Sequence, residues 1–157
     1  MVVVIGVVLA VVGGLAYLGS TLAPLAGRTP LPDLIVGQCF NGGRAPNGTG
    51  THIVLGVDVV DCSELHESEL MATFEYPGAS SGVAYPGEAN VGDHAEQECI
   101  LRFADYIGLR FTASSLEMSF LYPLSQNWTV GDYSIQCVVH PPVGQESSTG
   151  SYRGSKR

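Results

Sequence analysis

The longest hydrophobic stretch of the chain lies at its N-terminus. Val2–Leu18 consists almost entirely of valine, leucine, isoleucine, alanine and glycine, and the first charged side chain is Arg28. A run of this length can cross the hydrocarbon core of a bilayer as a helix, whereas a buried helix of a globular domain is usually interrupted by polar positions. The pattern therefore predicts a transmembrane helix within residues 1–26.

We expect this segment to remain attached as an anchor rather than to be cleaved as a signal peptide. No basic residue precedes it, and Pro24 disfavours cleavage near Ala23 or Ala26. The positive-inside rule, applied to Arg28 alone, would place the following domain in the cytosol. The cysteines favour the opposite side, and basic residues upstream of Met1 in the native protein would resolve the conflict.

Alternating and β-branched segments after this run predict a mostly antiparallel sheet. We expect a linker at residues 27–35, one domain at residues 36–140 and a flexible Ser/Gly-rich tail at residues 141–157. The expected strands are Gly37–Phe40, His52–Cys62, Glu69–Tyr76, Ser115–Tyr122 and Tyr133–His140. The second of these is a β-branched run and is expected to be buried.

One long helix is expected between the third and fourth strands, over Glu88–Ile107. Apolar side chains recur there every four residues, at Val91, Ala95, Cys99 and Phe103. Acidic residues near the start suit the helix dipole, and Gly108 is a typical stop signal. The order β-β-β-α-β-β predicts an α+β fold, a single domain with one main helix packed on the sheet.

The four cysteines fall in the predicted strands or on the apolar face of the helix. They are Cys39, Cys62, Cys99 and Cys137. None forms the close C-x-x-C pair typical of zinc ribbons and redox dithiols. An even number behind a membrane segment indicates two disulfides in an oxidising compartment, and three pairings are possible. We expect Cys39–Cys62, between neighbouring strands, and Cys99–Cys137, between the helix and the last strand.

Acidic side chains dominate the predicted domain. All 15 aspartates and glutamates lie between Asp33 and Glu146, where only three arginines oppose them, so the charge of this part is near −12. Such a surface repels phosphate backbones, which excludes nucleic-acid binding. The acidity is typical of a domain kept soluble in an exposed compartment.

Two short clusters raise the question of chemistry. In VVDCSELHESEL, residues 59–70, Cys62 and His66 are four residues apart among carboxylates, but a cysteine in a disulfide is neither a nucleophile nor a thiolate ligand. His94 and Glu98, one helical turn apart, could share a cation, yet two ligands are too few for a metal site. We therefore predict no catalytic residue, no metal and no cofactor, and hence no enzyme.

Short motifs are distributed along residues 36–154. They are Gly37-Gln38-Cys39, Val59-Val60-Asp61-Cys62 with His66 and Glu69-Leu70, Tyr85-Pro86-Gly87, Ala95 to Cys99, Pro123 with Trp128, Gly131-Asp132 and Cys137, and Thr149-Gly150-Ser151 with Gly154. Together they resemble the septum formation family, extracytoplasmic domains typical of actinobacteria. Gln38, Leu65 and Tyr133 depart from the family pattern. The resemblance implies a link to cell division or envelope assembly and carries no established catalytic residues.

These observations predict a membrane-anchored, non-catalytic interaction domain on the extracytoplasmic side of the cell membrane, with a single membrane pass. Its partners would be envelope or division proteins, and the expected contact surface is the loop edge near His66, Trp128 and Asp132, at predicted strand ends. One alternative is an accessory subunit of a larger envelope membrane complex. The other is a hydrolase of envelope polymers, which no paired-carboxylate motif supports.

Overall fold

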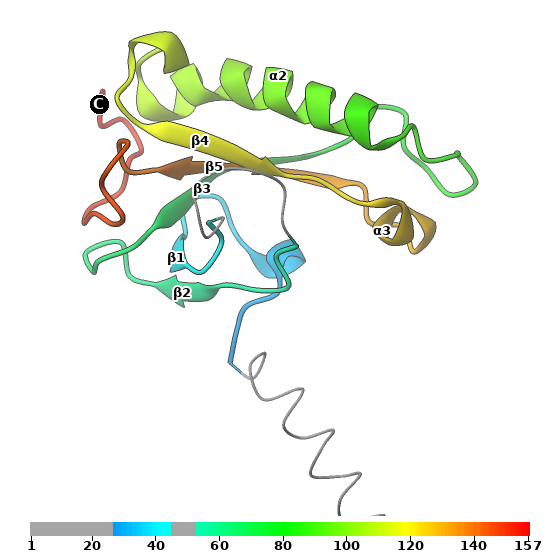
Figure 1. Cartoon of the computed structure of the whole chain (residues 1–157), viewed down its shortest axis with the longest axis horizontal. Coiled ribbons are helices and arrows are strands. Elements are labelled where there is room, and N and C mark those ends of the chain that lie inside the picture. The colour runs from blue at the N-terminus through cyan, green and yellow to red at the C-terminus, as the bar shows by residue number, and fades with distance from the viewer. Residues whose placement is uncertain (1–26, 45–52) are drawn as a thin grey trace, which may run out of the picture.

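A five-stranded antiparallel sheet carries one long helix on one of its faces (Figure 1). The computed structural model describes residues 27–44 and 53–157, and the strand order is β2-β1-β3-β5-β4. The strands are β1 Cys39–Asn41, β2 Asp58–Val60, β3 Ser68–Glu75, β4 Glu117–Leu121 and β5 Ser134–His140. The helices are α2 Glu88–Ile107 and α3 Ser125–Thr129, with 3-10 turns η2 at Leu31–Asp33 and η3 at Phe111–Ala113. The predicted α+β fold is confirmed.

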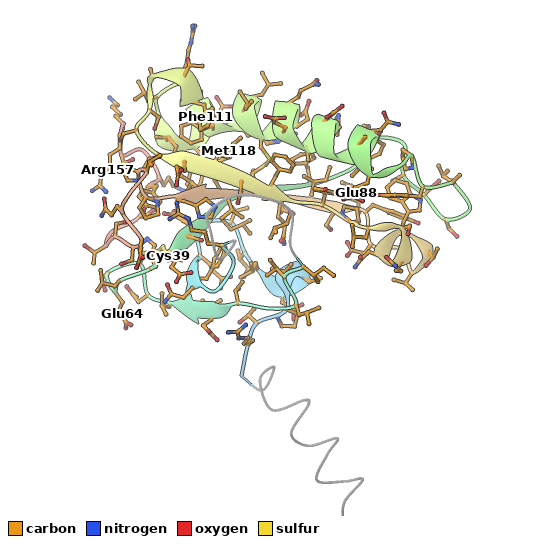
Figure 2. The ribbon with its side chains drawn as sticks, viewed as in Figure 1. Cys39, Glu64, Glu88, Phe111, Met118 and Arg157 are labelled. Atoms are coloured by element: carbon orange, nitrogen blue, oxygen red, sulfur yellow. A yellow bond between two sulfur atoms is a disulfide. The ribbon has the colours of Figure 1, made fainter. Side chains whose placement is uncertain are left out.

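Helix α2 packs on the larger of the two core clusters. Its four-residue repeat buries Val91, Ala95, Cys99 and Phe103 completely, against the α2-facing side chains of β3, β4 and β5. Side chains fill the space between α2 and β4, where Met118 is drawn (Figure 2). Gly108 ends the helix in a left-handed conformation with φ 81°, which glycine adopts without strain. The predicted bounds of this helix are confirmed.

A second cluster covers the opposite face of the sheet, and it comes partly from the segment predicted to be a linker. Leu34 packs there with Phe40, Val57, Leu70 and Val138. The backbone at Thr29 also pairs with Val57 in an isolated bridge. The linker prediction for residues 27–35 therefore differs from the structure, because the apolar side chain of Leu34 buries itself against the sheet.

The predicted buried strand His52–Cys62 is wrong in extent and in burial. His52 lies outside the described residues, and of Ile53–Cys62 only Asp58–Val60 forms a strand, β2, which lies at one edge of the sheet with its side chains largely exposed. Residues 53–57, which precede β2, instead pass over the face of the sheet opposite α2, where Val57 is buried and Leu55 is exposed. A β-branched run alone does not distinguish a central strand from a segment that packs over the face of a sheet.

The C-terminal segment belongs to the folded domain, in contrast to the predicted tail at residues 141–157. Tyr152 is fully buried in the α2-side core. The backbone N–H groups of Gly150 and Gly154 donate to the carbonyls of Cys62 and Tyr106 at 2.6 and 2.8 Å. A serine- and glycine-rich composition suggested mobility, but one large aromatic residue ties the segment to the core.

Both predicted disulfides are present. Cys39 is bonded to Cys62 and Cys99 to Cys137, and no cysteine is free. The first bond fixes the turn after β2 to β1, and the second joins the middle of α2 to β5. The pairing predicted from the placement of the four cysteines is confirmed.

The predicted transmembrane helix at residues 1–26 lies outside the described residues. Within the part of the chain that the structure describes, no helix combines the length and the apolar character that crossing a membrane requires.

Candidate functional site

The three residues predicted to form one contact surface are not brought together on an exposed patch. His66 is fully buried and Trp128 is 4% exposed, whereas Asp132 is partly exposed. Trp128 lies in α3, at the opposite end of the sheet from the C-terminal segment that covers His66 (Figure 1). The predicted surface is therefore wrong, because two of its three side chains stabilise the fold from within.

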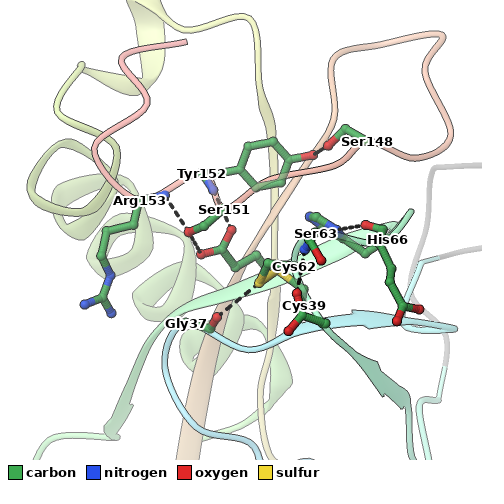
Figure 3. Close-up of a disulfide and its surroundings, with 12 residues drawn as sticks. Gly37, Cys39, Cys62, Ser63, His66, Ser148, Ser151, Tyr152 and Arg153 are labelled. Atoms are coloured by element: carbon green, nitrogen blue, oxygen red, sulfur yellow. Dashed lines mark hydrogen bonds between the residues drawn. A yellow bond between two sulfur atoms is a disulfide. The ribbon is translucent and has the colours of Figure 1, made fainter.

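His66 lies under the C-terminal segment. Its backbone pairs with Ser148, and its ring meets the edge of the Tyr152 ring at a centroid distance of 5.8 Å (Figure 3). The Nδ1 atom lies 2.9 Å from the Glu64 carbonyl, so Nδ1 carries the proton because a carbonyl only accepts. His66 is therefore a packing residue in this fold.

Trp128 is the centre of an aromatic cluster. Tyr76, Tyr85 and Tyr133 each present a ring at a steep angle to the indole, with centroid distances of 5.7, 5.6 and 4.8 Å. The indole N–H donates to the Val83 carbonyl at 2.8 Å. The cluster fastens the loop after β3 to α3, so Trp128 has no free face for a ligand.

A buried carboxylate, which the sequence analysis named only as part of a motif, organises the other end of the molecule. Glu69 is fully buried in β3, and its Oε1 accepts from the Tyr106 hydroxyl at 2.5 Å and the Ser151 hydroxyl at 2.6 Å. Its Oε2 accepts from the backbone N–H of Tyr152 at 2.6 Å. Burial, aided by the bond to Glu69, raises the pKa of Tyr106 to about 12, so this hydroxyl stays protonated and donates.

The candidate ligands for a metal have other roles in the described residues. Cys39, Cys62 and Glu69 lie within 4.8 Å of one another, but the two sulfurs are bonded and offer no thiolate. Glu98 forms an ion pair with Arg102, which lowers the pKa of its carboxyl, and His94 packs edge-on against Tyr76 at 5.1 Å. The expectation that His94 and Glu98 do not form a site remains a prediction.

An open groove of about 840 Å³ follows strand β4. Every residue from Glu117 to Pro123 lines it. Because successive side chains of a strand point to opposite faces, a hollow that reaches all of them wraps around the outer edge of the strand. The walls are the first turns of α2 on one side and residues 30–32 and 53–55 on the other. The groove was not predicted from the sequence, because segments far apart in the chain form its walls.

His140 closes one end of the groove and is held in one tautomer. Its Nδ1 lies 3.2 Å from the Glu67 carbonyl and 3.0 Å from the Ser68 hydroxyl, and its Nε2 lies 2.7 Å from the Ser119 hydroxyl. The carbonyl requires a proton on Nδ1, so Nε2 accepts from Ser119. Burial lowers the pKa of His140 to about 4, and the ring is neutral at physiological pH.

This histidine should make the fold acid-sensitive. Folding lowers the pKa of His140 from its ordinary value of 6.5 to about 4. The stabilisation that neutral His140 contributes is therefore fully present above pH 6.5 and is lost as the pH falls toward about 4. We expect a loss of about 2 kcal/mol between about pH 7 and about pH 5 from this residue. Urea unfolding of the wild type and of His140→Gln at both pH values measures it. Equal losses in the two proteins would contradict the assignment.

Charges along the groove are unbalanced. Five carboxylates line it, from Glu88, Asp93, Glu96, Glu117 and Asp132, and Arg44 is the one permanently charged base among the described lining residues. Arg44 forms an ion pair with Glu117 at one end. The remaining carboxylates leave the groove with a negative potential that favours a cationic ligand.

Comparison with known proteins identifies the family. A family model described as septum formation matches residues 36–156. The chain belongs to the septum formation family. The predicted resemblance is thereby confirmed, and membership indicates a role in septum formation. No curated protein and no solved structure matches the chain.

Most motifs of the septum formation resemblance have structural roles in this member. Gly37, two residues before the disulfide-bonded Cys39, has a φ angle of +99°. Its N–H donates to the Leu70 carbonyl at 2.8 Å. Glu69 and Ser151, far apart in sequence, share a hydrogen bond. Several motifs of this septum formation domain therefore hold the fold together, whereas two motif residues, Pro123 and Asp132, line the groove along β4.

Proposed function

We propose that the protein is a non-catalytic binding domain that acts in septum formation and cell-envelope assembly, anchored to the membrane on its extracytoplasmic side. The observation that carries the binding role is the open groove of about 840 Å³ along β4. Its walls combine exposed apolar side chains, such as Ile53 and Leu55, with a few charged groups. This mixture is typical of a recognition site.

The cysteines support the extracytoplasmic placement. All four form disulfides, and such bonds persist in oxidising compartments and are rare in the cytosol. The uncharged segment at residues 1–26, which is long enough to span a bilayer, supports the anchor.

Three of the polar groups that a hydrolase could use are already engaged, which favours a binding role over hydrolysis. A hydrolase that uses two carboxylates needs one as an acid and one as a base beside the substrate. Glu117 in the groove is ion-paired with Arg44, and Glu69 is fully buried with three hydrogen-bond donors. Both nitrogens of His140 are engaged by neighbouring groups.

Topology and localisation test the proposal in cells. The full-length chain carrying alkaline phosphatase after Arg157 should give phosphatase activity, because that enzyme folds outside the cytoplasm. A labelled full-length chain should gather at division sites and should release no soluble fragments from purified peptidoglycan. An inactive phosphatase fusion, a uniform distribution or release of fragments would each contradict one part of the proposal.

A second candidate is an accessory subunit of a larger envelope membrane complex. Leu101 on α2 is 67% exposed and lies outside the groove, beside the partly exposed Ile100. In this candidate, a partner subunit would cover these two side chains of α2. Purification in mild detergent separates the candidates, because a stoichiometric complex that survives washing would favour the subunit.

A further inference from the structure

We propose that the outer edge of β4 binds an extended, basic peptide segment of a partner protein, which pairs with β4 as an additional strand. This inference rests on the proposed function, since it names the kind of partner that the binding domain takes. The site consists of the edge of Glu117–Leu121 and the two walls of the groove around it.

Within residues 27–44 and 53–157, no strand pairs with the outer edge of β4. Among the described residues, β4 pairs with β5 alone and ends the strand order of the sheet. Alternate residues of an edge strand direct their N–H and C=O groups away from the sheet, where a further strand can bond to them. Since the groove reaches both faces of β4, an added strand would lie between the two walls rather than on an open surface.

Strand β4 lacks several of the features that usually prevent such pairing, and its one charged side chain, Glu117, is ion-paired with Arg44. Edge strands in soluble proteins commonly carry lysine, proline or a bulge. The sequence from Glu117 to Leu121, EMSFL, has neither residue, and its register with β5 is continuous over five residue pairs. All five side chains of β4 are only partly buried, so an added strand would cover further surface along it.

The charges select a basic occupant. Glu88, Asp93 and Glu96 are exposed on the α2 wall, and Asp132 lies on the wall near α3. Figure 2 shows Glu88 near the start of α2. An extended peptide presents alternate side chains to opposite walls. Lysine or arginine at the positions facing α2 would meet these carboxylates, whereas apolar side chains would meet the wall that holds Leu55.

The same charges disfavour a second copy of this chain as the occupant. Pairing of two β4 edges would bring two sets of groove carboxylates together, and like charges brought close together repel. A partner with basic, extended segments avoids that repulsion.

Binding of designed peptides to the full-length protein in detergent micelles tests the inference. The probe is a fluorescent peptide of alternating lysine and valine, followed by fluorescence anisotropy. We expect saturable binding that weakens at least about tenfold when the backbone nitrogens of the peptide are methylated, because methylation removes the donors that pair with the edge. Replacement of its lysines by glutamate should weaken binding by at least about tenfold.

Two matched triple variants separate local charge from overall charge. Glu88→Gln/Asp93→Asn/Glu96→Gln should weaken binding about tenfold. The control variant Glu64→Gln/Asp105→Asn/Glu146→Gln removes the same charge at exposed positions outside the groove and should change binding less than about twofold. Equal effects of the two variants, or equal binding of the methylated peptide, would overturn the inference.

The remaining outcomes are also decisive. Absence of peptide binding, self-association through β4 in sedimentation experiments, or binding of glycan fragments in place of the peptide would each overturn the inference. If the peptide fails to bind but the full-length chain still gathers at division sites outside the cytoplasm, the edge inference fails and the proposed function stands. If the peptide fails to bind and the chain also fails to gather at division sites outside the cytoplasm, both the edge inference and the proposed function are overturned.

Discussion

Replacing Glu69 with alanine should lower the free energy of unfolding by about 4 kcal/mol. The carboxylate is fully buried and accepts from the hydroxyls of Tyr106 and Ser151 and the backbone N–H of Tyr152. Its removal leaves these donors without their acceptor and opens a cavity between β3 and the C-terminal segment. Urea unfolding of the two proteins measures the difference.

Two further measurements distinguish this role from a general effect of losing charge. Glu64→Ala removes an exposed carboxylate from the preceding turn and should change the free energy of unfolding by less than about 0.5 kcal/mol. Hydrogen exchange at the Tyr152 amide should accelerate in Glu69→Ala, because its acceptor is gone. A destabilisation below about 1 kcal/mol, or unchanged exchange at Tyr152, would show that Glu69 does not fasten the C-terminal segment.

Loss of the Cys99–Cys137 disulfide should cost a similar amount. The bond closes a loop with a sequence separation of 38, for which the chain-entropy account gives about 4 kcal/mol. Both sulfurs are fully buried between α2 and β5, so a Cys99→Ala/Cys137→Ala variant also loses core contacts. Urea unfolding under oxidising conditions measures the loss.

The other disulfide provides the matched comparison. Cys39→Ala/Cys62→Ala opens a loop with a separation of 23 and should cost about 3 kcal/mol, with less loss of packing because Cys62 is only partly buried. An unfolding curve of the wild type that does not change after reduction, or peptide mapping that finds another pairing, would contradict the structural role of these bonds.

The sequence predicted the parts of the fold that depend on local repetition. The four-residue spacing from Val91 to Phe103 and the stop at Gly108 defined α2, and the strands that became β3 and β5 were expected within a residue or two of their observed bounds. The disulfides followed from this placement, since two cysteines on neighbouring elements can be bridged only when their side chains meet.

The parts that were missed depend on contacts between distant residues. Tyr152 is one aromatic residue in a segment of low complexity, and only the pocket formed by α2 and β3 shows that it is buried. Glu69 belongs to a motif of the family resemblance, but the sequence does not show that it is buried or that its three donors come from α2 and the C-terminal segment. Single-sequence patterns contain no information on such partners.

The candidate site shows the same limit. His66 and Trp128 drew attention because histidine and tryptophan are frequent in binding sites, yet both are buried in this fold. The groove is formed by β4, the start of α2 and two segments near the N-terminal end of the domain. Only the order of the strands in the sheet reveals that β4 is an edge.

Site-specific photo-crosslinking in cells tests the central claim that a partner binds along β4. Leu55 on the groove wall and Leu101 on the outer side of α2 are 69% and 67% exposed, so they are equally accessible positions for a photoreactive amino acid in the full-length chain. We predict a crosslink to a division or envelope protein from position 55 and none from position 101. Crosslinks from position 101 alone would contradict the claim.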